Sequence, residues 1–261
     1  MNNLPQELVD LIVDQLYFQS ADSLHWRQAL TRCSMSSSRF RTSCLRWLFR
    51  SVPLGDGPQR RNLASFRELI MSSPRLVALI RELEVRHYFN IQLSLLQQVL
   101  SDLPRLQSLL LDAVGLRGAP TAMKPIPLRN LYLKRVITND DITLNTLLGL
   151  FSGIEHFTLQ TLNLATPVDR HSGYPEPRLQ LKQLSLFMLV TTSMAARRAK
   201  DILHTMNYAV ASCTTLRACL SPLCLAEWGT LISSVGRSIV NLEFLRLERL
   251  REKGRPTALR H

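Results

Sequence analysis

The chain has 261 residues, 46% of them hydrophobic, and a formal net charge of +12. This length and apolar content suffice for a substantial core in one or two domains and exclude an intrinsically disordered chain. No run approaches the ~20 consecutive apolar residues of a membrane-spanning helix, and three acids stand where a signal peptide would be basic and then apolar. The sequence therefore predicts an intracellular protein, in the cytoplasm or nucleus, with no membrane association.

The cysteines and the placement of charge restrict further which class of protein this can be. The cysteines are odd in number and never form CxxC, which favours buried apolar thiols over a disulfide framework or a zinc module. They are Cys33, Cys44, Cys213, Cys219 and Cys224. Half of the net charge, +6, lies in residues 191–261. A basic quarter can attract nucleic acid or an acidic partner, but its bases are interspersed with acids, which favours an ordinary solvated surface.

Residues 4–16, LPQELVDLIVDQL, predict a helix with an unusually wide apolar face. At 100° per residue, Glu7, Asp10 and Asp14 form a narrow polar strip, while the apolar side chains spread over roughly 200°. An ordinary surface helix needs about half of that arc. Two interpretations remain: burial on two sides within the chain's own fold, or one face for the core and one for a partner. The apolar positions are Leu4, Leu8, Val9, Leu11, Ile12, Val13 and Leu16.

Two more helices are expected before residue 54. Asp22 and Ser23 are suited to cap a helix that continues to Cys33. A serine-rich turn then leads into a helix whose apolar residues recur at helical spacing from Phe40 to Phe49. The Gly, Pro and charged residues of 55–61 indicate a linker. The expected organisation is a helical unit over 1–54, a linker over 55–61, a second unit over 62–250 and a disordered basic tail over 251–261.

Beyond the linker, the pattern LxxLxLxx(L/V) repeats. It begins at residues 80, 106, 128, 154, 181, 216 and 242, with a poor fit at 216, so the spacings are 26, 22, 26, 27, 35 and 26 residues. A leucine-rich repeat has this apolar frame and a period of 20–29 residues. The Asn or Cys that usually ends the motif is absent. Its ninth position holds Tyr88, Val114, Val136, Leu162, Leu189 and Leu250.

The fourth and sixth residues of each frame are predicted to point into the core, because alternate strand residues face opposite sides. Stretches with helical spacing, at 94–104, 143–153 and 195–213, would form an outer layer. The predicted fold class is therefore α/β: three short helices, then an irregular solenoid, or horseshoe, of leucine-rich-repeat-like units. The Pro- and Gly-rich residues 166–180 predict a long connection, and neutral length variation is favoured there over recognition. The last frame lacks a following helix or cap.

The first 54 residues resemble the F-box family. Its CxxVSRxW…LF segment is similar to residues 33–49, although Met35 and Phe40 replace Val and Trp, and Ser37 and Ser38 widen the spacing. The ending LFRSVPL is similar to F-box-like proteins of fungi, and the repeats agree with the leucine-rich subclass. The family's opening motif, LPxE(L/V)xxxIxxxL, is matched by Leu4, Pro5, Glu7, Leu8, Ile12 and Leu16.

The resemblance implies a role and a partner. F-box domains bind the SKP-type adaptor of a cullin-RING ubiquitin ligase, and the rest of the chain holds a protein substrate while other subunits transfer ubiquitin. Such a partner would account for the second apolar face of residues 4–16. The positions that the resemblance assigns to the adaptor interface or to the F-box core are Leu4, Pro5, Leu8, Ile12, Leu16, Phe40 and Leu48.

No motif for catalysis or for a cofactor stands out. The chain has no GxxxxGK[ST], HExxH, GxSxG or GxGxxG sequence. Its six histidines are scattered without metal-ligand spacing. We therefore expect no enzyme activity, no cofactor and no metal.

The concave strand face of a solenoid is the expected place for a substrate. Its outward positions mix acids, bases, amides and aromatics, which is typical of a protein-binding surface, whereas a nucleic-acid groove is mainly basic. Nucleic acid is therefore not the expected partner. The alternative is a leucine-rich scaffold without a ligase connection, associated with nucleic acid through the basic C-terminal quarter. The residues expected to contact a protein substrate are Tyr132, Lys134, His156, Gln160, Phe187, Phe244 and Arg246.

Overall fold

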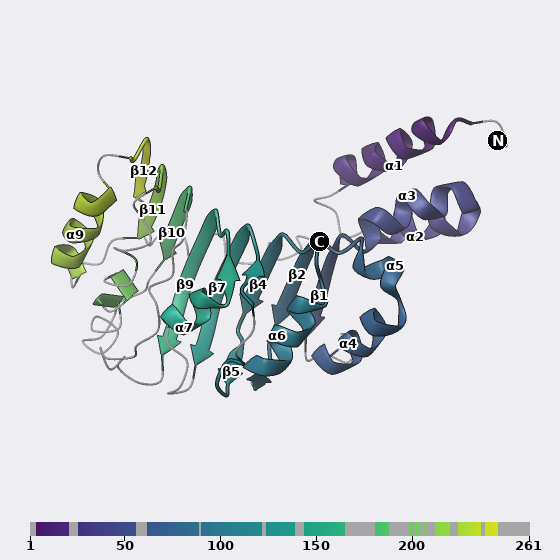
Figure 1. Cartoon of the computed structure of the whole chain (residues 1–261). Coiled ribbons are helices and arrows are strands. Elements are labelled where there is room, and N and C mark those ends of the chain that lie inside the picture. Colours follow the sequence, from purple (N-terminus) through teal and green to yellow (C-terminus); the bar gives the residue numbers. More distant parts are fainter. Residues whose placement is uncertain are drawn as a thin grey trace, which may run out of the picture.

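The computed structural model is an α/β fold built on a mostly parallel sheet (Figure 1). It describes residues 4–20, 26–55, 62–88, 90–121, 124–138, 144–164, 181–187, 199–200, 202–203, 206, 212–219, 224–235 and 238–244. The connection expected at 166–180 and the tail expected at 251–261 lie outside the described residues. None of the helices in the described part has the length and apolar character needed for a membrane span.

Three helices form the N-terminal helical unit: α1 (Gln6–Ser20), α2 (Trp26–Ser36) and α3 (Ser38–Leu48). Ser37 separates α2 from α3, and its side chain caps α3 by accepting a hydrogen bond from the backbone N–H of Arg39, at 3.3 Å. The unit has a small core of its own, to which all three helices contribute. Its buried members are Val13, Leu30, Cys44 and Trp47.

After the helical unit, the chain forms a sheet whose main path of strands follows the order of the chain. Every neighbouring pair is parallel. The path is β1 (Ser51–Gly55), β2 (Glu82–Arg86), β4 (Ser108–Asp112), β7 (Asn130–Thr138), β9 (His156–Leu164), β10 (Gln183–Phe187), β11 (Thr215–Cys219) and β12 (Asn241–Phe244). Two short strands pair beside this path, β3 (Ile91–Gln92) with β5 (Gly115–Arg117) and β5 with β7, while β6 (Ile126–Pro127) and β8 (Phe151–Ser152) form a separate two-stranded sheet.

Helices cover one side of this sheet (Figure 1). They are α4 (Leu63–Ser72), α5 (Pro74–Val77), α6 (Leu93–Ser101), α7 (Leu144–Gly149) and α9 (Leu225–Val235). Phe66 of α4, Leu96 of α6, Leu147 of α7 and Trp228 of α9 are buried in the same core as the strands. Parallel strands joined by crossovers need such a layer, because the apolar side of the sheet must be removed from water.

The register aligns five of the predicted repeat frames. In the frames that begin at 80, 106, 128, 154 and 181, the fourth and sixth residues fall in two columns that run across the sheet. All of them are fully buried, as predicted: Leu83, Val85, Leu109, Leu111, Leu131, Leu133, Phe157, Leu159, Leu184 and Leu186.

The last two frames were predicted three residues too late. Leu216 and Ala218 of β11 lie beside Leu184 and Leu186, so this frame begins at residue 213 and the next one at residue 239. The pattern misleads here because Ala218 is a small residue in a leucine position, while leucines further along the chain imitate the frame. The longest interval between frames after residue 80 thereby shortens from 35 to 32 residues.

The sheet also begins earlier than the sequence indicates. In β1, Val52 lies beside Leu83 and Leu54 beside Val85. The unit boundary predicted at residue 54 therefore falls inside a strand, and Gly55 belongs to that strand and not to a linker. This first frame begins at Phe49, 31 residues before the next one, which is longer than the period used to find the others.

A left-handed residue stands at the eighth position of three consecutive repeat frames. His87, Ala113 and Arg135 have φ values of 59°, 54° and 52°, and each is the eighth residue of its frame. Such a residue interrupts the two-residue alternation, so the ninth residue points inward again. The ninth residues Tyr88, Val114 and Val136 are buried. This packing explains why an apolar residue occupies the place where Asn or Cys was expected.

Candidate protein-binding surfaces

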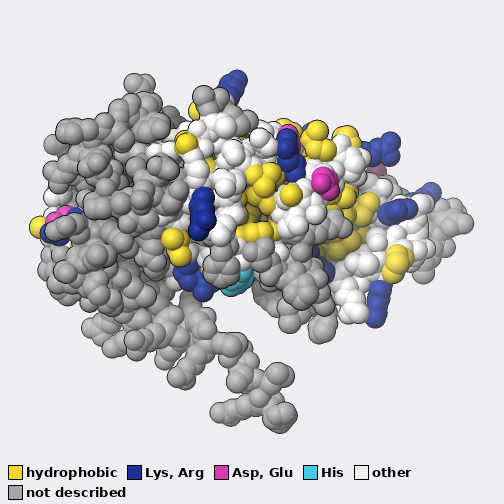
Figure 2. All heavy atoms as spheres, turned by 90° about the horizontal axis from the view of Figure 1, so that it is seen from below, with side chains coloured by type: hydrophobic (Ala, Val, Ile, Leu, Met, Phe, Trp, Pro, Cys, Tyr) yellow, Lys and Arg dark blue, Asp and Glu magenta, His cyan; other side chains and the backbone are white. Residues whose placement is uncertain are grey.

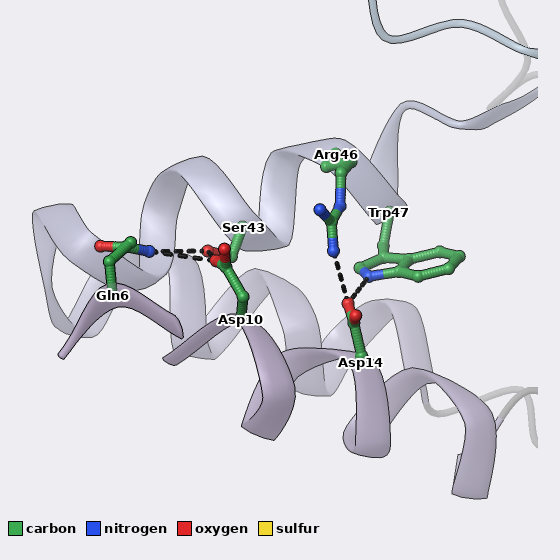
Figure 3. Close-up of polar contacts among 6 residues, drawn as sticks. All are labelled: Gln6, Asp10, Asp14, Ser43, Arg46 and Trp47. Atoms are coloured by element: carbon green, nitrogen blue, oxygen red, sulfur yellow. Dashed lines mark hydrogen bonds and ion pairs between the residues drawn. The ribbon is translucent and has the colours of Figure 1, made fainter. Parts of the chain in front are cut away.

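Helix α1 turns two of its acids toward α3 (Figure 3). Asp10 accepts hydrogen bonds from Oγ of Ser43 and from Nε2 of Gln6, the latter at 3.1 Å. Gln6 Nε2 also donates to Ser43 Oγ, at 3.1 Å. These hydrogen bonds, above all the one from Ser43, hold the pKa of Asp10 below its ordinary value because they stabilise the ionised carboxylate.

Asp14 makes the second polar contact between these helices, one turn further along (Figure 3). Its Oδ1 accepts from Nη2 of Arg46 at 2.6 Å and from Nε1 of Trp47 at 2.7 Å. Trp47 is buried, so its indole N–H requires an acceptor. Val9 and Val13 are buried on the same side of α1. The acids Asp10 and Asp14 of the polar strip therefore help to attach α1 to α3.

The opposite side of α1 carries an apolar surface that the chain leaves exposed. Leucine and isoleucine side chains are normally buried, and here several lie together on one helix face. We call this surface the α1 stripe; it consists of Leu8, 47% exposed, Leu11, 56%, Ile12, 42%, and, at its C-terminal end, Phe18, 65%, whose ring also meets that of Trp47 edge-on with centroids 5.6 Å apart. Grouped exposed apolar side chains of this kind are typical of protein interaction sites.

The seven residues that the resemblance placed in the adaptor interface or the F-box core divide into two sets. Leu8 and Ile12 belong to the α1 stripe, Pro5 is exposed beside them, and Leu4 is half-buried. The other three, Leu16, Phe40 and Leu48, pack against the small core of the helical unit. The predicted set therefore mixes surface positions with core positions.

Three exposed apolar residues were missing from that set. Leu11 lies in the apolar arc of residues 4–16 but is absent from the family motif, so the helical wheel was the better signal. Phe18 follows the predicted helix, which in fact continues to Ser20. Met35, on α2, is 75% exposed. Its position in the motif, where the family has Val, gave no indication of its exposure.

The second candidate surface is the side of the sheet that faces away from α4, α6 and α7, which we call the open face. The register brings several predicted residues together there. Lys134, Gln160 and Phe187 follow one another in a single column across β7, β9 and β10. His156 and Gln183 are neighbours in another column, with Nδ1 of His156 3.2 Å from Oε1 of Gln183.

The predicted open-face residues differ in exposure. Tyr132 is exposed, whereas Lys134, His156, Gln160 and Phe187 are half-buried. Phe244 was placed on the wrong side, because its frame was shifted: it lies beside Ala218, in a column that is otherwise buried. Arg246 lies outside the described residues.

Charges on the open face are mostly compensated. Asp112 is buried and accepts from Nε and Nη2 of Arg135, at 3.0 and 2.7 Å, and its other oxygen lies 4.0 Å from Lys134. Arg86 pairs with Glu84 at 2.9 Å. On the underside of the molecule, too, the described Lys and Arg side chains are spread apart and do not merge into one patch (Figure 2). The described open face therefore does not form a continuous basic track of the kind that follows phosphates.

The basic C-terminal quarter shows the same compensation within its described part. Lys200 pairs with Glu227 at 2.7 Å, and Arg217 pairs with Glu243 at 2.8 Å. These are the two cations of residues 191–261 that fall among the described residues. Neither of them is left as an isolated positive charge for a nucleic-acid backbone.

In the described part of the chain, cysteines and other potential ligands do not form a metal centre. Four of the five thiols are buried and Cys33 is half-buried, in line with the prediction. Burial raises the pKa of Cys44 to about 11, so it is a protonated core residue at neutral pH. Among the described residues, no group of three or more His, Cys, Asp or Glu is placed to hold a metal ion.

Comparison with known proteins adds no relative. No family model matches the sequence, and no curated protein matches it.

Proposed function

We propose that this chain is an F-box substrate-recognition subunit of an SKP–cullin–F-box ubiquitin ligase. In this proposal the helical unit is the F-box, the sheet with its helices is an irregular leucine-rich-repeat solenoid, and the α1 stripe binds the SKP-type adaptor. The observation that carries the proposal is the inverted orientation of α1, in which acids are bonded to α3 and leucines are exposed.

The size of the α1 stripe is consistent with such an interface. Burying one Leu, Ile or Phe contributes about 1.5–3 kcal/mol, and association itself costs an estimated 4–15 kcal/mol. The four side chains of the stripe are 42–65% exposed, so completing their burial supplies about 3–6 kcal/mol in total, near the lower end of what association consumes. Additional exposed residues at the same end of the unit, such as Pro5 and Met35, would provide the surplus.

The open face is the proposed position of the protein substrate. Its mixture of the exposed Tyr132, half-buried amides and paired charges suits a protein partner better than a polyanion. In this role the chain contributes binding and positioning while other subunits carry out ubiquitin transfer. The alternative, a nucleic-acid-associated scaffold, gains no support from the described cations of the C-terminal quarter, because both are paired.

The test is capture of a purified SKP-type adaptor by the full chain, at low and at high salt, with one variant and one control. We expect Leu8→Asp to abolish capture, because a charge placed in a desolvated apolar contact is strongly unfavourable. Met71→Asp is the matched control: Met71 is 64% exposed on α4, far along the chain from the stripe, and this variant should bind normally.

Salt separates the proposal from its alternative. Apolar docking should persist at high salt, whereas binding through phosphate contacts falls steeply as salt rises. Capture that Leu8→Asp leaves unaltered would refute the assignment of the stripe. If the unmodified chain captures no adaptor, the F-box function itself is wrong.

A further inference from the structure

A pocket of about 260 Å³ lies at the junction between the helical unit and the first strand of the sheet, β1, with its neighbouring helices. It is lined by residues of α2, the end of α3, β1, α4 and α5, and by Ile80. The described lining residues are Arg27, Leu48, Phe49, Ser51, Val52, Pro53, Leu54, Phe66, Leu69, Ile70, Leu76 and Ile80.

Polar contacts hold this junction together around the pocket. The carbonyl oxygen of Arg50 accepts hydrogen bonds from the backbone N–H groups of Arg81 and Glu82, both at 2.9 Å. Nη2 of Arg27 donates to the carbonyl oxygen of Ser51, at 2.8 Å. The walls of the pocket therefore come from two parts of the chain that are already fastened to each other.

The walls of the pocket are mostly apolar. Ten of the twelve described lining residues are apolar, and several of them, including Phe49, Val52 and Leu69, are half-exposed. Arg27 is the one ionisable side chain among them. Its guanidinium lies over the ring of Trp26, 5.0 Å from the ring centroid, and no described carboxylate forms an ion pair with it.

We propose that this pocket binds a small amphipathic carboxylate, with an apolar body between β1 and α4 and its carboxylate on Arg27. Ligand sites are typically apolar clefts with a few polar groups that fix orientation, and they favour junctions between units. A guanidinium carries five N–H donors, of which the bond to Ser51 uses one, and its planar fork suits a carboxylate. The inference does not depend on the proposed ligase function.

Octanoate is a suitable probe, and 1-octanol is the matched compound without a charge. Calorimetric titration of the full chain should show saturable binding of octanoate and weaker binding of 1-octanol. Arg27→Gln should weaken octanoate at least about tenfold, as expected for a lost charge-assisted hydrogen bond, and leave 1-octanol unchanged. Arg32→Gln is the control, because Arg32 is an exposed arginine on the same helix that does not line the pocket.

The apolar walls have a test of their own. Each methylene added between hexanoate and octanoate should tighten binding about fourfold. Leu69→Trp should fill the pocket and abolish binding of both acids, while circular dichroism and thermal melting check that each variant is folded. Should Arg27→Gln fail to fold, this second variant still decides the matter.

Three results would overturn the inference. They are an absence of saturable octanoate binding, equal affinity for octanoate and 1-octanol, or octanoate affinity that survives Leu69→Trp in a folded protein. None of them bears on adaptor capture, so failure here and failure of the ligase proposal are distinguishable.

Discussion

At the scale of single residues, the position of hydrogen-bond donors on α3 decides which side of α1 is buried. Ser43 and Trp47 are buried or nearly so and present an O–H and an N–H toward α1. Carboxylates satisfy such donors, and leaving them unsatisfied would be costly. Asp10 and Asp14 are therefore drawn inward, and Leu11 and Ile12, which lie between them in the sequence, turn to the outside.

Ser43→Ala should lower the stability of the helical unit at neutral pH and make that stability depend less on acid. The folded-state pKa of Asp10 lies below its ordinary value of 3.8, mainly through the Ser43 hydrogen bond. Ionised Asp10 therefore stabilises the fold above the unfolded pKa, and this stabilisation disappears as the pH falls through the folded pKa. Without Ser43 the folded pKa rises toward the ordinary value, so less of this stabilisation is present at neutral pH and less of it is lost on acidification.

A carboxyl NMR titration of Asp10 and thermal melts between about pH 7 and pH 3 measure this effect. Ser38→Ala, at an exposed serine of the same helix, serves as the control. An unchanged Asp10 titration in Ser43→Ala would show that the hydrogen bond does not set this pKa.

Ala113→Gly should be neutral or stabilising, unlike most changes to glycine. Ala113 has a φ of 54°, where a residue with a Cβ is disfavoured by about 1–2 kcal/mol. Glycine removes that strain but costs about 0.5–1 kcal/mol in unfolded-state entropy, so the free energy of unfolding should rise by about 0–1.5 kcal/mol. At Ala78, where φ is −66°, the same change should lower it by about 0.5–1 kcal/mol.

Urea unfolding of the two variants provides the comparison. The difference in sign between them is the decisive quantity, since it removes the general effect of introducing a glycine. A loss of stability at Ala113 equal to that at Ala78 would mean that the left-handed position carries no strain.

At the scale of elements, α1 is attached to the helical unit through one of its faces. Val13, Leu16 and Tyr17 supply apolar contacts, with the Tyr17 ring stacked on that of Trp47, centroids 3.9 Å apart, while Asp10 and Asp14 supply the polar ones. Because its other face is exposed, this helix cannot rely on burial alone. Polar bonds to α3 must therefore carry a substantial part of its attachment.

Asp14→Ala should destabilise the helical unit by about 1–2 kcal/mol. The change leaves the Trp47 indole N–H and Arg46 without their acceptor, which costs about 1–3 kcal/mol. The better helix propensity of Ala returns at most about 0.7 kcal/mol. Gln15→Ala, at the next and exposed position, should change stability by less than about 0.5 kcal/mol. Hydrogen exchange of the α1 amides would locate the effect, and equal exchange in both variants would contradict it.

At the scale of the whole molecule, the helical unit and the sheet are joined without a spacer. α3 ends at Leu48 and β1 begins at Ser51, so the end of the first unit is the first strand of the second. β1 covers the edge of β2, and Leu54 fills the core beside Val85. The N-terminal segment thus completes the sheet as well as forming its own helices.

A chain that begins at residue 62 should be less stable than one that begins at residue 49. The shorter chain loses Leu54, whose burial contributes about 2 kcal/mol, and exposes the unpaired edge of β2, which promotes aggregation. Thermal melting and size-exclusion chromatography of the two chains measure the difference. Equal melting temperatures and equal monomer content would mean that β1 is dispensable to the sheet.

Much of the strand register followed from the sequence. Apolar residues at the fourth and sixth positions of five frames are buried as predicted, because strong apolar alternation permits only one orientation. The two late frames failed where Ala218 weakens that alternation. β1 was missed because its frame contains Pro53 and lies outside the usual period.

The sequence by itself determined the α/β class, the three N-terminal helices, the strands of the regular frames and the excess of apolar surface on α1, since all of these follow from local periodicity. Only the tertiary structure decided which part of that surface is exposed, that residues 51–55 complete the sheet, and that a pocket opens at the junction. These features depend on partners distant along the chain, such as Asp14 with Trp47 or Val52 with Leu83. Local periodicity contains no information about such pairs.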